Sequence, residues 1–302
     1  MLQSSYLITN LDIVPKVFLG PEYLNLPGLP THLPLVILSA IFYQCVYSFV
    51  APLLWSVFED TDPNSSPGET IRSVYYFNNI VSVTQSFINS VLAVYLLSHP
   101  EFRDGLNPSE MALGYQKETA RVLAVSMGYF VYHLIETWMH IGRHGINMVL
   151  HAVCALFAVS LGYRPLALHY TGTFLIWELP NLFLNFQRLL DHSGRRNSWY
   201  RAVNRIVLLS TYAVFRLGLG SFSLLRMSHQ FFLTATDPHP MLRAECVVPS
   251  LLVNSEAKAQ QVSRLPILLA IFQLTSMTVV HIQGFVWFTK IVLKGDLRKK
   301  YE

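Results

Sequence analysis

Seven apolar runs divide the chain, and each is close to the length of a helix that crosses a bilayer. They cover residues 33–58, 74–98, 121–140, 146–163, 166–190, 202–225 and 265–293. A membrane helix needs about 20 mainly apolar residues. The fourth run is short, and the fifth contains Pro180, which lacks the N–H of a helix hydrogen bond and should kink or break the helix. The pattern predicts an all-α integral membrane protein with about seven transmembrane helices.

Polar positions recur inside the third, fourth and fifth of these runs at helical spacing. The first and last members of each trio are seven positions apart on one helix face, and the three trios are His133, Glu136 and His140; Asn147, His151 and Cys154; and Glu178, Asn181 and Asn185. Ionisable side chains are unfavourable against lipid. We therefore expect the three stripes to point inward, around a polar pocket or water-filled cavity.

Depth along the helices suggests which of these groups meet. At 1.5 Å rise per residue, Glu136 and His151 should both lie roughly 6–8 Å below the cytosolic surface. Arg216 is near the middle of the sixth run, where it must find an anion or reach back to the surface. Glu178 is the carboxylate nearest its expected depth, so we predict an ion pair between Arg216 and Glu178.

Segments outside the runs set the predicted domain boundaries and orientation. Residues 1–32 contain four prolines and one lysine, without the pattern of a cleavable signal, and are expected to be irregular or interfacial. Residues 33–295 form the predicted transmembrane domain, and 296–302 a basic tail. Basic residues crowd the connection after the fifth run and the C-terminus, which predicts that both are cytosolic. The sequon at Asn64 would then be cytosolic and unmodified.

Composition places the chain in the membrane class. Of 302 residues, 52% are hydrophobic and only 13% are charged, about half the charged fraction of a soluble domain. The net charge of +4 gives no nucleic-acid signature, and three cysteines give no disulfide framework. No hydrolase or nucleotide-binding motif is found, and a single HxxxH pair, His140 and His144, falls short of a di-iron histidine set. We expect no metal and no cofactor.

Three interpretations of the inward polar stripes follow from the residues alone. The polar side chains can hold the bundle together through hydrogen bonds between helices. They can line a lipid-binding cavity. They can also form a catalytic site, in which His151 is the general base and Glu136 orients it.

Several stretches resemble the TLC-domain family of membrane proteins, which includes translocating-chain-associating proteins and ceramide synthases. The similar stretches, in order over about residues 40 to 295, are SMGYFVYHLIETW, the His151 stretch MVLHAVCALFAV, WELPNLFLNFQRLL with Glu178 and Asn185, AVFRLG with Arg216, and IQGFVWFTKIVLKG. The resemblance is closest to the small TLC-domain-containing proteins. It implies a six-helix barrel with an extra helix at one end, and an endoplasmic reticulum membrane location.

Departures from the ceramide synthases bear on the activity that the resemblance implies. Those enzymes carry two adjacent histidines and a later histidine–aspartate pair. Here Leu150 precedes His151, and the later helix offers Glu178, Asn181 and Asn185. The position before Leu134, commonly acidic in the small TLC-domain proteins, is His133. These departures argue against acyl transfer to a sphingoid base.

We therefore predict a multi-pass endomembrane protein that binds or senses a lipid and takes part in lipid homeostasis. Its predicted partner is a sphingolipid, a phospholipid or an acyl chain, with no nucleic acid. The residues predicted to line or brace the cavity are His133, Glu136, His140, Asn147, His151, Glu178, Asn181, Asn185 and Arg216. The alternatives are a lipid acyltransferase that uses His151 and Glu136, and a non-catalytic membrane scaffold.

Overall fold

The computed structural model describes residues 26–58, 67–99, 105–192, 198–237, 242 and 267–299. Within these ranges the chain forms helices and their connections, without strands. The prediction of an all-α fold is confirmed. The sequon at Asn64 and residues 300–302 of the predicted tail lie outside the described residues.

The described helices join into seven successive rods. In chain order the rods are α3 (Leu29–Cys45) with the π-helical turn η1 (Val46–Val50) and α4 (Ala51–Phe58); α5 (Pro67–Ser98); α7 (Lys117–Met139); α9 (Ile146–Leu161); α10 (Thr171–Leu175) with the 3₁₀ turn η4 (Ile176–Glu178) and α11 (Leu179–His192); α12 (Trp199–Thr211) with the π-helical turn η5 (Tyr212–Gly218) and α13 (Leu219–Thr236); and α16 (Ile267–Lys299). Three short helices lie between rods: α6 (Pro108–Leu113), α8 (Ile141–His144) and η3 (Leu168–Tyr170).

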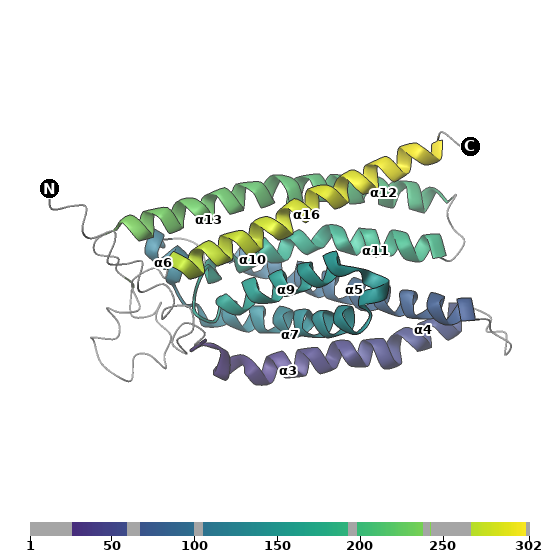
Figure 1. Cartoon of the computed structure of the whole chain (residues 1–302), viewed down its shortest axis with the longest axis horizontal. Helices are drawn as coiled ribbons and strands as arrows, with labels where there is room; N and C mark the ends of the chain where they lie inside the picture. Colours follow the sequence, from purple (N-terminus) through teal and green to yellow (C-terminus); the bar gives the residue numbers. More distant parts are fainter. Residues whose placement is uncertain are drawn as a thin grey trace.

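Six of the rods close a ring, and the first rod lies outside it. Around the ring, α5 contacts α7, α7 contacts α9, and α9 contacts α16. The α12–α13 rod then contacts α16 on one side and the α10–α11 rod on the other, and the α10–α11 rod contacts α5. The first rod packs against α7 and α5. Figure 1 shows the rods running back and forth along the long axis, so that the ends of α4, α7, α11 and α16 lie together at one end. This arrangement agrees with a six-helix barrel that carries one extra helix.

Four of the described rods contain segments long and apolar enough to cross a membrane: Leu29–Ser56, Ser73–Ser98, Trp199–Thr236 and Ile267–Leu293. The helix α9 is apolar but has only 16 residues. Large apolar side chains face outward on these segments, including Phe49, Phe222 and Leu225. An apolar outer surface of this extent is typical of contact with lipid. The protein is therefore a membrane protein, while seven crossings remain a prediction.

The fifth rod shows where the sequence pattern misplaced a boundary. Its helix begins at Thr171 rather than at the predicted residue 166. The preceding residues form a turn in which Ala167 takes a left-handed conformation, with φ of 57°, followed by the short helix η3. The break expected from Pro180 is present, because the 3₁₀ turn η4 ends two residues before it. Pro180 cannot donate an N–H to the carbonyl of Ile176, four residues earlier, so the regular α-helix stops there.

Close packing of α3 on α7 fixes the first rod to the ring. A Cβ atom added at Gly128 of α7 would lie 2.5 Å from Cβ of Ser39 and 2.6 Å from the carbonyl oxygen of Val36. The Ser39 hydroxyl also donates to the carbonyl oxygen of Val125, at 2.7 Å. Near the start of α3, the His32 ring is hydrogen-bonded to the Tyr115 hydroxyl at 2.8 Å. Only a glycine at position 128 allows this approach of the two helices.

We predict that Gly128→Ala lowers the free energy of unfolding by about 1–3 kcal/mol, because the added methyl group overpacks the α3–α7 contact. The matched control is Gly142→Ala in α8, where an added Cβ meets no atom within 4 Å. Thermal unfolding of the purified protein in detergent measures both. Equal melting temperatures for the two variants would contradict the packing described here.

Candidate functional site

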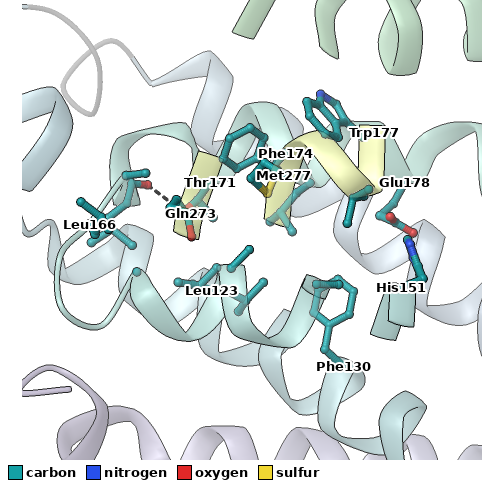
Figure 2. A pocket seen from close by; sticks show the side chains of 18 of the residues that line it. Leu123, Phe130, His151, Leu166, Thr171, Phe174, Trp177, Glu178, Gln273 and Met277 are labelled. Atoms are coloured by element: carbon teal, nitrogen blue, oxygen red, sulfur yellow. Dashed lines mark hydrogen bonds between the residues drawn. The ribbon is translucent and has the colours of Figure 1, made fainter. Parts of the chain in front are cut away.

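A cavity lies inside the ring. Most of its wall is apolar, and this part includes Leu123, Phe130, Ala155, Ala158, Leu166, Phe174, Trp177, Met277 and Val280. Polar side chains lie at its two ends, with Thr171 and Gln273 at one and Glu178 and His151 at the other, and Arg216 also lines the cavity. Figure 2 shows Glu178 and His151 pointing toward one another at their end of the cavity. The cavity is therefore amphipathic, with an apolar wall between two polar ends.

Arg216 is buried in the wall of this cavity without a carboxylate partner. Its exposed fraction is 1%, and it lies in the π-helical turn η5, a type of helix distortion that is frequent at functional sites. No ion pair among the described residues includes it. The guanidinium carbon lies 5.6 Å from the ring centres of both Tyr212 and Trp287. Two aromatic faces therefore stabilise this cation.

Asn181 connects Arg216 to Glu178, in place of the direct ion pair that the sequence predicts. The Arg216 Nη1 group donates to Oδ1 of Asn181 at 3.2 Å, and Nδ2 of Asn181 donates to Oε2 of Glu178 at 2.7 Å. Asn181 lies one turn after Glu178 on the same face, so its amide reaches the guanidinium first. The predicted direct pair is wrong, although the three residues do form one chain of hydrogen bonds.

His151 is held in one tautomer by α16. Its Nδ1 atom lies 3.0 Å from Oε1 of Gln283, and Nε2 of Gln283 donates to the carbonyl oxygen of Asn147 at 3.4 Å. The side-chain oxygen of Gln283 can only accept, so Nδ1 of His151 carries the proton. The Trp287 ring packs edge-on against the imidazole, with 5.0 Å between ring centres. Nε2 of the neutral imidazole is consequently left with its lone pair.

Glu136 lies in a separate cluster at the end of α7, and the structure does not bring it to His151. Its Oε1 atom accepts from Nδ2 of Asn78 at 2.8 Å and lies 3.0 Å from Nε2 of His144. His140 contributes Nδ1, 3.5 Å from the same oxygen. The predicted pairing assumed that equal depth brings two residues together. Glu136 instead faces α5 and α8, while His151 faces α16.

The remaining predicted residues do not line the cavity. His133 stacks on the Tyr129 ring with 5.5 Å between ring centres, and Asn147 is exposed. Asn185 is buried and accepts a hydrogen bond from Arg188 at 3.0 Å. Among the described residues, no three His, Cys, Asp or Glu side chains are placed to hold a metal ion. Of the predicted set, His151, Glu178 and Arg216 therefore line the cavity, Asn181 is hydrogen-bonded to two of them, and the other residues lie away from it.

Sequence reasoning missed the contribution of the seventh run to the site. Gln273 lines the cavity, Gln283 orients His151, and Trp287 packs against both His151 and Arg216. Two glutamines inside an apolar run were the available signal. The second run carries a similar signal, because Gln85 and Asn89 of α5 are buried and Asn89 accepts from the Ser126 hydroxyl at 2.9 Å.

Comparison with known proteins identifies the family. The TLC domain, as described by its family sequence profile, matches residues 77–293, which include most or all of each of the six ring rods. An uncharacterized TLC domain-containing protein of Schizosaccharomyces pombe is 31% identical over 200 residues, 66% of each chain. Topoisomerase I damage affected protein 4 of Saccharomyces cerevisiae is 23% identical over 64% of this chain and 68% of its own. TLC domain-containing protein 2 of Danio rerio is 26% identical over 50% and 61%. The chain belongs to the TLC domain family.

Proposed function

We propose that this protein binds a membrane lipid inside its helical ring and takes part in lipid homeostasis in the endoplasmic reticulum membrane. The observation that carries this proposal is the amphipathic cavity. A mainly apolar lining with a few polar groups placed at its ends is typical of pockets that bind small organic ligands. A lipid matches this cavity, because an acyl chain can lie along the apolar wall while a polar group lies at the end with His151 and Glu178.

Roles for the predicted residues follow from this proposal. His151, Glu178, Asn181 and Arg216 form the polar end of the lipid site. His133, Glu136, His140, Asn147 and Asn185 lie outside the lipid site, where Glu136 joins α7 to α5 and α8 through Asn78 and His144. Basic residues after α11 and in the C-terminal segment support a cytosolic location for that end of the ring.

Filling the cavity should remove the bound lipid. Ala158 of α9 lines the cavity, so Ala158→Phe places a ring in the space that the acyl chain would occupy. Val153→Phe, on the exposed face of the same helix, is the matched control. We expect native mass spectrometry to show a lipid adduct on the wild type and the control, and loss of that adduct in Ala158→Phe.

A folded Ala158→Phe variant with an unchanged adduct would contradict the proposed site. If the wild type retains no defined lipid under conditions that preserve its fold, the lipid-binding proposal itself is overturned.

Acyl transfer is the second candidate, and the tautomer of His151 is the observation that favours it. His151 lines the cavity, and Gln283 fixes its ring through Nδ1, which leaves the lone pair on Nε2. As a general base, Nε2 would take the proton of a lipid amine or alcohol, whose nitrogen or oxygen attacks the thioester carbonyl of an acyl-CoA and expels the thiol. In this arrangement Gln283, rather than Glu136, orients the base.

If the protein is an acyltransferase, His151→Ala should abolish product formation in an assay with labelled long-chain acyl-CoA and a pool of lipid amines and alcohols. His229→Ala, at an exposed position on α13, is the control variant. Product from the wild type that is lost only in His151→Ala would establish the enzyme. Absence of product from folded wild type would leave lipid binding as the function.

A further inference from the structure

One positive charge in the ring lacks a negative partner among the described residues. A guanidinium carries five N–H donors and stays charged in proteins. For Arg216, one of these donors has an acceptor in the described structure, the neutral Oδ1 of Asn181. The Nε atom is fully buried without a hydrogen-bond partner. Among the described residues, Arg216 therefore has no negatively charged partner and too few hydrogen-bond acceptors for its donors.

The fold excludes the usual ways by which an arginine within a membrane is accommodated. Arg216 is only 1% exposed, near the middle of the α12–α13 rod, so its head does not reach water. Glu178, the carboxylate on the same cavity wall, is separated from it by the Asn181 amide. The contacts with Tyr212 and Trp287 stabilise a cation but accept no conventional hydrogen bond.

The position of Arg216 indicates which kind of ligand would neutralise its charge and accept its free hydrogen bonds. Its side chain lines the cavity whose remaining wall is mainly apolar. Arginine pairs with carboxylate and phosphate through two parallel hydrogen bonds, which suit the donors that Arg216 has free. The complementary ligand is thus an acidic group attached to an apolar chain.

We propose that the cavity selects a single-chain lipid with an acidic head, a carboxylate or a phosphate, that binds to Arg216. This inference rests on the proposed lipid-binding function and adds the charge class of the ligand. A single chain is favoured over two because the space inside the ring is small and its wall is mainly apolar. The Asn181 amide holds the guanidinium in place while Glu178 stays outside direct contact with it.

The test compares ligands that differ only in charge. Purified full-length protein in dodecyl maltoside is titrated with oleate, with methyl oleate and with oleoyl lysophosphatidic acid, and occupancy is read by native mass spectrometry. Because hydrogen bonds to a charged group contribute more than neutral ones, we expect wild type to bind the acidic ligands about tenfold or more tightly than the ester. Preference for oleate over the phosphate, or the reverse, identifies the acidic group.

Variants assign the preference to Arg216. Arg216→Met should remove the preference for the acids while binding of methyl oleate persists, and Arg216→Lys should retain part of it. Arg226→Met, at an exposed position on α13, is the matched control and should behave as wild type.

Equal affinity of folded wild type for oleate and its methyl ester would overturn the inference even if Arg216→Met fails to fold. Retention of the preference in folded Arg216→Met would overturn it as well. Failure of wild type to bind any of the three ligands would instead count against lipid binding itself, so the two proposals fail in distinguishable ways.

Discussion

Enclosing one guanidinium inside an apolar ring is the constraint on which the centre of this structure depends. A charged side chain in hydrocarbon is unfavourable by several kcal/mol. The ring offsets this with groups from three rods: Asn181 from α11, Tyr212 from η5 and Trp287 from α16. The Tyr212 hydroxyl also donates to the carbonyl oxygen of Gly284 at 3.0 Å, which ties η5 to α16. The contacts that stabilise Arg216 therefore also join three rods of the ring.

The sequence alone was sufficient to predict the all-α fold class and several of the buried polar groups, including His151, Asn185 and Arg216. Apolar runs fixed the helices, and polar residues within those runs indicated the interior, because lipid would reject them. Pro180 marked the break in the fifth rod for a local covalent reason. Each of these features is a property of a single segment, so periodicity and composition are enough to predict it.

The sequence did not predict which side chains of different rods contact one another. Depth along a helix can be counted, but rotation of one helix about its axis relative to the next is set by packing. Glu136 and His151 share a predicted depth, yet Glu136 turns toward Asn78 and His151 toward Gln283, 132 residues away in the chain. The direct pairing of Arg216 with Glu178 failed for a similar reason, since Asn181 occupies the space between them.

The short helix α9 has a consequence for the surrounding bilayer. Its 16 residues extend about 24 Å, whereas the hydrocarbon layer of a typical membrane is about 30 Å thick. The apolar side chains of Leu150 and Val153 are exposed on the outer face of this helix. Hydrophobic mismatch is relieved by thinning of the bilayer beside the shorter segment. If α9 crosses the bilayer, as the sequence predicts, the membrane around this protein should be thinnest along α9, and the protein should be better matched to a thin bilayer than to a thick one.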